Sequence, residues 1–296
     1  MIKINIKKTR LDSICTKYSK HIIEKIKPLD SNDVFEYYKS QFPNIISAHP
    51  EDFDYFHEGF TAKFKFESDD FKLFYEHMKS EYKRLFGNVI EPKTTLGTWL
   101  ASELNIKVCP YCNRQYTFTV SNLENNKGVR PQFDHFCPKS EFPYFALSFY
   151  NLIPSCPTCN HAKGEDAIDI NPYVEGFGAN CKFTIDKLEK CILNGNRDLW
   201  SVNLPSNGIH ISHVSAFALN DLYNQHKDYV EEIVTKAQSY DDGYYKSLID
   251  SFSGLGLSER GMNVLIFGNY TSVDDFDKRP LSKLTADILE QLEIKL

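Results

Sequence analysis

The residues of this chain best suited to chemistry are concentrated between positions 109 and 163. Two C-x-x-C pairs, Cys109–Cys112 and Cys156–Cys159, frame this stretch. Each pair can present two sulfurs to one ion, and thiolate ligands favour zinc. We therefore predict that these four cysteines bind a structural zinc ion and thereby hold together the two ends of the segment between them.

The alternative for these cysteines is a buried core position or a redox role. Proline and polar residues inside the pairs, which read CPYC and CPTC, make poor core sequence. A redox motif of the thioredoxin type uses one such pair, and this chain has two. Cys15, Cys137, Cys181 and Cys191 follow no metal-ligand spacing and are interpreted as structural.

A D-H dipeptide, Asp134-His135, lies between the two cysteine pairs. A neutral imidazole can take a proton from water near pH 7, so His135 is the candidate general base. A hard cation such as Mg²⁺ or Mn²⁺ prefers oxygen ligands, which Asp134 and Asn160 could supply. Because neighbouring residues of a strand point to opposite sides, we expect Asp134 to face the metal and His135 to face the water.

Three further residues complete the predicted site. Asn151 is suited to hydrogen-bonding the backbone of the loop after His135 and so to holding the base in place. Lys139 and Lys163 are the candidate phosphate contacts. His161 remains an alternative to Asn160 as the second ligand of the catalytic metal.

Taken singly, these residues have ordinary interpretations, since an Asp-His pair is usually surface chemistry and a lone asparagine usually marks a turn. Their joint spacing is what favours a site. Asn151 follows His135 by 16 residues, Asn160 follows Asn151 by nine, and Asn160 comes directly after a cysteine pair.

The pattern of the surrounding residues predicts an α+β protein that is mainly helical, with a small ββα core. Strands are expected at 116–120, 131–136 and 152–154, a turn at 125–128, and a short helix from about 158. The flanking helices are expected at 12–27, 31–41, 50–59, 68–86 and 95–105, then as one long helix across 214–234, and at 243–252, 258–268 and 280–294. Three regions follow: a helical region 1–105, a metal-bearing core 106–175 and a helical region 176–296.

Composition excludes several classes of protein. A formal net charge of −6 gives no global attraction to nucleic acid, although basic residues outnumber acidic ones in the first 30 positions. No run approaches the roughly 18–20 apolar residues of a membrane span, and no signal peptide is visible, so we expect a cytoplasmic protein without a membrane partner. Thiols stay reduced in that compartment, which again favours metal ligation over disulfides.

These motifs resemble the HNH (ββα-metal) endonuclease family in its four-cysteine branch. The family pattern of C-x-x-C, D-H-x-x-P, N-L and C-x-x-C-N-x-x-K reads here as CPYC, Asp134 to Pro138, Asn151-Leu152 and CPTCNHAK. The resemblance covers about 60 of the 296 residues. It implies an endonuclease with a four-cysteine zinc site, with His135 as base, Asp134 and Asn160 on the catalytic ion, and Asn151 bracing the loop. It also implies products with 5′-phosphate and 3′-hydroxyl ends.

The run from Phe133 to Gly164, followed by Ile170-Asn171-Pro172-Tyr173, is similar to the HNH subunits of bacterial Septu-type and retron-associated anti-phage systems. Those subunits work beside an ABC/SMC-like ATPase. The resemblance implies such an ATPase as partner, with the helical flanks as partner-binding and substrate-gating surfaces. This chain itself has no G-x-x-x-x-G-K-[ST] nucleotide-binding loop.

Three functions therefore stay open from the sequence. The first is a metal-dependent endonuclease for DNA that acts in bacterial defence. The second keeps the nuclease but directs it to RNA such as tRNA, because a mechanism in which water attacks does not separate DNA from RNA. The third is a zinc-stabilised module that binds nucleic acid or a partner without catalysis.

Overall fold

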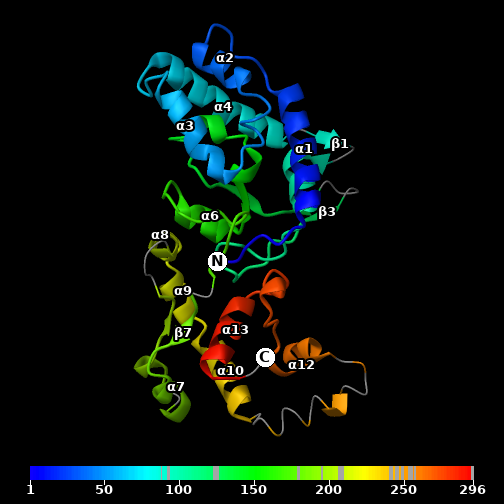
Figure 1. Ribbon diagram of the computed structural model, residues 1–296, viewed down its shortest axis with the longest axis vertical. Helices are drawn as coiled ribbons and strands as arrows, with labels where there is room; N and C mark the ends of the chain where they lie inside the picture. The colour runs from blue at the N-terminus through cyan, green and yellow to red at the C-terminus, as the bar shows by residue number, and fades with distance from the viewer. Residues whose placement is uncertain are drawn as a thin grey trace. The chain divides into compact units, whose positions relative to one another are not determined.

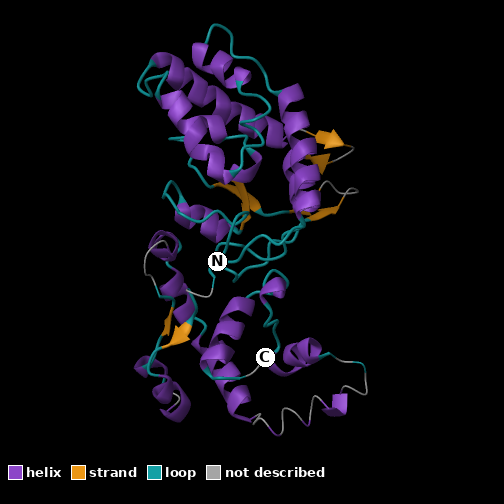
Figure 2. Cartoon of the chain, in the orientation of Figure 1, coloured by secondary structure: helices purple, strands orange, loops and turns teal. Residues whose placement is uncertain are grey.

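The computed structural model describes residues 1–87, 89–91, 94–122, 127–178, 181–194, 196–205, 210–239, 243, 247, 250–252, 256 and 258–294. Helices predominate and the described strands pair in twos, so the class is α+β (Figures 1 and 2). No helix within these ranges has the length and hydropathy needed to cross a membrane.

The chain divides into two compact units. The first, called here the DH unit because it contains Asp134-His135, comprises residues 5–106 and 117–174. The second, the C-terminal unit, comprises residues 1–4, 107–116 and 175–296. These two units are defined by which residues contact one another in space. The three regions predicted from the sequence, 1–105, 106–175 and 176–296, were defined by motif and composition. The segment 107–116, which holds the first cysteine pair, is therefore grouped with residues far along the chain.

The DH unit contains the helices of the N-terminal half and three of the small sheets (Figure 2). Its helices are α1 (Lys8–Lys25), α2 (Asp33–Ser40), α3 (Phe53–Thr61), α4 (Asp69–Gly87), α5 (Leu96–Leu104) and α6 (Pro157–Lys163), with 3₁₀ turns η1 (Pro50–Asp52), η2 (Pro143–Phe145) and η3 (Phe149–Asn151). Its strands are β1 (Val89–Glu91), β2 (Thr94–Thr95), β3 (Val120–Asn122), β4 (Lys127–Val129), β5 (Gln132–His135) and β6 (Leu152–Ser155).

Strands β5 and β6 and helix α6 form the unit's central ββα arrangement. The two strands are antiparallel, with Asp134 opposite Ile153 and His135 opposite Leu152. Helix α6 follows β6 directly and contacts β5. The strand segments predicted at 131–136 and 152–154, and the helix predicted from about 158, therefore lie where the sequence placed them.

The strand predicted at 116–120 was wrong in extent, because β3 begins only at Val120. Only Tyr116 and Val120 of that segment take part in β pairing: Tyr116 bridges Val108, and Val120 begins β3, which pairs with β4. Alternation of aromatic and β-branched residues indicates an extended chain, but extended chain without a paired neighbour is not a strand. The first half of the turn predicted at 125–128 lies outside the described residues, and its second half belongs to β4.

A core of aromatic rings holds the DH unit together and fixes α4 in place. Phe74 and Met78 of α4 are fully buried, and Phe60 of α3 stacks on Tyr144 of η2 at 4.2 Å between ring centroids. Burying rings of this size is the main favourable contribution to folding, and their edge and stacked contacts add specificity. Helix α4 thereby packs against the loop that joins β5 to β6.

In its described residues, the C-terminal unit consists of helices and one two-stranded sheet. Its elements are β7 (Thr184–Ile185), α7 (Leu188–Asn194), η4 (Arg197–Leu199), β8 (Val202–Asn203), α8 (Ile211–Ala216), α9 (Leu219–Asn224), α10 (Lys227–Ser239), α12 (Glu259–Phe267), η6 (Val273–Asp275) and α13 (Ser282–Gln291). Strands β7 and β8 are antiparallel. Helices α12 and α13 correspond to the predictions at 258–268 and 280–294, while the one at 243–252 lies largely outside the described residues.

The single long helix predicted across 214–234 was also wrong, because α8, α9 and α10 divide it. Ala218 adopts a left-handed backbone conformation at φ 46°, which ends the helical path before α9 begins. The sequence does not predict a left-handed residue at an alanine, because glycine or asparagine usually occupies such positions. The apolar spacing still holds within each helix, where Val214, Leu219, Val230 and Ile233 are buried.

Candidate functional site

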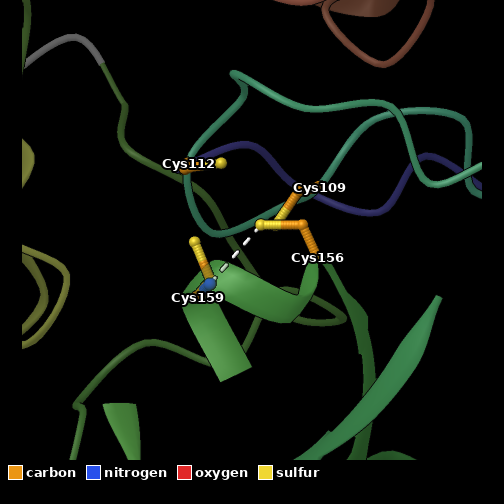
Figure 3. Close-up of side chains that lie close together, drawn as sticks. All are labelled: Cys109, Cys112, Cys156 and Cys159. Atoms are coloured by element: carbon orange, nitrogen blue, oxygen red, sulfur yellow. Dashed lines mark hydrogen bonds between the residues drawn. The ribbon is translucent and has the colours of Figure 1, made fainter. Parts of the chain in front are cut away.

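The four cysteines of the two C-x-x-C pairs lie together in the structure and are buried (Figure 3). Their sulfur atoms all lie within 4.8 Å of one another. A tetrahedral zinc ion with Zn–S bonds of about 2.3 Å needs sulfurs about 3.8 Å apart, so small side-chain rotations suffice to reach that geometry. None of the eight cysteines is paired in a disulfide, so the four-cysteine group could hold a metal ion such as zinc.

In both cysteine turns a backbone N–H group points at a cysteine sulfur, an arrangement that suits a metal ligand. The backbone N–H of Arg114 donates to the sulfur of Cys112 at 3.4 Å, and that of Cys159 donates to the sulfur of Cys156 at 3.5 Å. Such N–H donors stabilise the negative charge of a ligating thiolate. Asn113, directly after the first pair, closes its turn in the left-handed conformation, which asparagine tolerates better than most residues.

The D-H dipeptide borders a cavity of about 540 Å³ that lies wholly within the DH unit. Asp134, His135, Lys139 and Asn160 all line it. Asp134 and His135 were expected to face opposite sides of the strand. They border the same cavity, which is lined by all four residues of β5. The lining residues are Tyr75, Lys79, Tyr82, Lys83, Arg130, Gln132, Phe133, Asp134, His135, Pro138, Lys139, Ser140, Asn160, Gly164 and Glu165.

The imidazole of His135 is held in one tautomer. Its Nε2 lies 3.0 Å from the carbonyl oxygen of Ala146, and a carbonyl only accepts, so Nε2 carries the proton. Nδ1 is therefore the basic nitrogen. The ring is 6% exposed and meets the ring of Tyr82 edge-on at 4.7 Å. Burial, followed by the nearby charge of Lys139, holds the pKa of His135 well below its ordinary value, so the ring is neutral at pH 7.

Asn151 ties down the loop that follows His135. Its Oδ1 accepts from the backbone N–H of Cys137 at 2.7 Å, and its Nδ2 donates to the carbonyl oxygens of Phe145 and Cys137. The side chain is fully buried, so breaking these bonds would strand polar groups away from water. The sequence predicted this bracing role for Asn151, and its hydrogen bonds are of that kind.

Lys163 does not occupy the position expected of a phosphate contact. Its ammonium is buried, donates to the backbone carbonyl of His135 at 2.9 Å and lies 3.5 Å from the carboxylate of Asp134. The end of α6 is turned toward β5, so the side chain points inward rather than toward solvent. Sequence alone gives no signal for this, because lysine in a short helix is usually exposed.

Two oxygen-bearing side chains in the cavity could serve a divalent cation. Asp134 offers a buried carboxylate. The Nδ2 of Asn160 donates to the Oε1 of Gln132 at 2.6 Å, and this hydrogen bond does not use the amide oxygen of Asn160. Mg²⁺ is commonly held by one or two such groups together with water and substrate phosphate, so both side chains are of the chemical kind that could hold it. His161 is exposed and does not line the cavity.

Cations predominate around this cavity. Besides Lys139, they include Lys79 and Lys83 of α4 and Arg130, against the two carboxylates of Asp134 and Glu165. Lys139 lies 4.8 Å over the ring of Tyr82, and burial lowers its pKa. Sequence reasoning missed the residues of α4 and Arg130, because they lie outside the motif and only the fold brings them to it.

The cysteine group generates a prediction about zinc. Cys159→Ser should lose the single bound zinc and lower the melting temperature by about 10 °C. Losing a structural metal removes several kcal/mol, and each kcal/mol corresponds to roughly 2–4 °C in chains approaching this length. Metal content by elemental analysis and thermal unfolding measure the two effects. Cys15→Ala is the matched control, a buried cysteine outside the group; equal zinc content in both variants would rule the site out.

The depressed pKa of His135 generates a prediction about acid stability. Below the ordinary histidine pKa of 6.5 the unfolded chain binds a proton at this residue, whereas the folded chain does not. Stability therefore falls as pH decreases through that value, by up to about 1.4 kcal/mol per pH unit from this group.

In His135→Gln the acid dependence of the urea midpoint should be shallower than in the wild type. Protonation of the cysteine thiolates affects both proteins and cancels in the difference. Parallel slopes between about pH 7 and about pH 5.5 would show that the buried ring is not the titrating group.

Comparisons of this chain with protein-family models, with curated proteins and with solved structures found no match. The function proposed below is supported by the cavity, the cysteine group and the spacing of the motif residues.

Proposed function

We propose that this protein is a metal-dependent HNH endonuclease that hydrolyses phosphodiester bonds in nucleic acid. The observation that carries the proposal is the convergence of a neutral, oriented imidazole, a carboxylate and an amide in one cavity bordered by four cationic side chains. Phosphodiester hydrolysis requires a base for water, neutralisation of phosphate charge and stabilisation of the departing oxygen.

In the proposed reaction, Nδ1 of His135 accepts the proton of the attacking water. The carbonyl of Ala146 keeps the ring in the tautomer that leaves Nδ1 free of a proton, and Asn151 fixes the loop that carries this carbonyl. Lys139 and Arg130 border the cavity and would offset the charge of the phosphate. A divalent cation held by Asp134 and Asn160 would supply Lewis-acid stabilisation of the phosphorane oxygens and the 3′ leaving group.

The proposal favours DNA as substrate, with RNA such as tRNA as the alternative. It also includes a role as the effector of a bacterial anti-phage system, beside an ABC/SMC-like ATPase. That part rests on the resemblance of the run from Phe133 to Gly164 alone. Its expected signature is cleavage that depends on the ATPase.

One observation favours a second candidate, a non-catalytic zinc-stabilised module. The carboxylate of Asp134, the main expected ligand of the catalytic cation, already lies 3.5 Å from the buried ammonium of Lys163. An ion pair of this kind can serve the fold alone. The two candidates separate on whether Mg²⁺ or Mn²⁺ supports any cleavage by the zinc-loaded protein.

His135→Ala should lower cleavage about 10²–10⁴-fold, the usual contribution of a general base. The assay uses supercoiled plasmid and total tRNA, with Mg²⁺ or Mn²⁺, with and without any ATPase that co-purifies with the chain. Zinc content and thermal unfolding verify that the variant is folded. Undiminished cleavage by a pure His135→Ala preparation would refute the proposal.

A neighbouring pair of variants tests the cation ligand. Asn160→Ala should raise the metal concentration needed for half-maximal cleavage, because it removes one of the two protein ligands. His161→Ala, one residue further along α6 and exposed, should leave that concentration unchanged. The reverse result would assign the ligand to His161.

A further inference from the structure

Helix α4 presents a second, polar face to the cavity in addition to the apolar face that packs in the core. Tyr75, Lys79, Tyr82 and Lys83 all line the cavity. Their spacing of four, seven and eight residues from Tyr75 places them along one side of a helix. Helix α4 ends more than 20 residues before the first cysteine pair, so this wall is no part of the motif itself.

Aromatic rings and ammonium groups alternate along this wall. The ammonium of Lys79 lies 5.3 Å over the ring of Tyr75, and that of Lys139 lies 4.8 Å over the ring of Tyr82. Both tyrosines are partly exposed. Rings on which bases stack, beside cations that follow the phosphates, are the chemistry by which proteins bind single-stranded nucleic acid.

The depth of the site points to the same kind of substrate. His135 is 6% exposed and is covered on one side by the ring of Tyr82. A scissile phosphate must therefore enter a concave cavity of about 540 Å³ between α4 and the end of β5. In a regular duplex the backbone is held by paired bases on a convex surface, whereas an unpaired strand can bend into such a cavity and turn its bases outward.

We propose that α4 is the substrate-binding wall of the site and that the site takes an unpaired strand of nucleic acid. Lys79 and Lys83 bind phosphates beside the scissile one, and Tyr75 stacks on a base. Tyr82 stays against His135 and shields it. The proposal deepens the nuclease function proposed above and rests on it for the identity of the scissile bond, but strand binding by α4 can be measured without turnover.

The test is fluorescence anisotropy of the zinc-loaded full chain without added Mg²⁺ or Mn²⁺. The probes are a labelled oligodeoxythymidylate, its ribo counterpart and a blunt hairpin duplex of equal charge. We expect either single strand to bind about tenfold or more tightly than the duplex, and the two single strands show whether sugar type matters. Equal affinity for duplex and single strand overturns the proposal.

The lysine pair is tested by Lys79→Ala combined with Lys83→Ala. Each lost phosphate contact should reduce the slope of log K against log salt by about 0.7 for a single strand, so the double variant should lose about 1.4. Lys65→Ala combined with Lys72→Ala is the matched control, since it removes the same charge from exposed lysines outside the cavity. An equal loss in the control would show that only net charge matters.

The stacking position is tested by Tyr75→Leu, which should weaken single-strand binding about fivefold or more, while Tyr75→Phe should retain it. Tyr55→Leu, at an exposed tyrosine of α3, is the control and should have no effect. Wild-type affinity in Tyr75→Leu would remove Tyr75 from the proposal.

The two proposals fail separately. Binding that depends on α4 without any metal-dependent cleavage would refute the nuclease and leave the strand-binding wall intact. Cleavage that depends on His135 but not on Lys79, Lys83 or Tyr75 would support the nuclease and refute the strand-binding wall.

Discussion

Lys163 carries an ammonium group that has no access to water, and the geometry around Asp134-His135 depends on how that charge is satisfied. A buried charge is tolerated only when it is paired and hydrogen-bonded. Here the carboxylate of Asp134 and the backbone carbonyl of His135 provide both. The same lysine ends α6, the helix that begins at the second cysteine pair. One buried cation therefore links the helix of the second cysteine pair to the strand that carries the candidate base.

Burial sets the protonation of His135, and the charges near this ion pair act with it. Burial is the largest cause that lowers the pKa of the imidazole, and Lys139 and Lys163 also disfavour the positive ring. The ring thus stays neutral and ready to accept a proton, although a strongly lowered pKa also makes it a weaker base. A bound phosphate would raise the pKa of His135, whereas a bound divalent cation would lower it. The excess of cations in the cavity is consistent with a site completed by an anionic substrate.

The sequence predicted the parts of the site that depend on local spacing. Each C-x-x-C turn places its own two cysteines side by side, and the pairing of β5 with β6 brings Asn151 to the loop after His135. The inward position of Lys163 and the wall formed by α4 depend on packing between distant segments. The sequence predicted a helix at 68–86, and α4 lies there. The pattern could not show that Tyr75 and Lys79 line the same cavity as the D-H dipeptide.

The flanking regions also contribute to the geometry of the motif, beyond any role in binding a partner. Within the C-terminal unit, Asn113 closes the turn of the first cysteine pair and is itself held by residues far along the chain. Its side chain donates to the carbonyl of Phe276 at 2.8 Å and accepts from the backbone N–H of Lys283 at 3.0 Å. Tyr223 of α9 donates to the carbonyl of Cys112. Each cysteine turn is therefore held by different elements. Helices α9 and α13 hold the first turn, and helix α6 with strand β5 holds the second. The motif spans about 60 residues, yet the geometry of its first cysteine turn also depends on Tyr223, Phe276 and Lys283 far outside it.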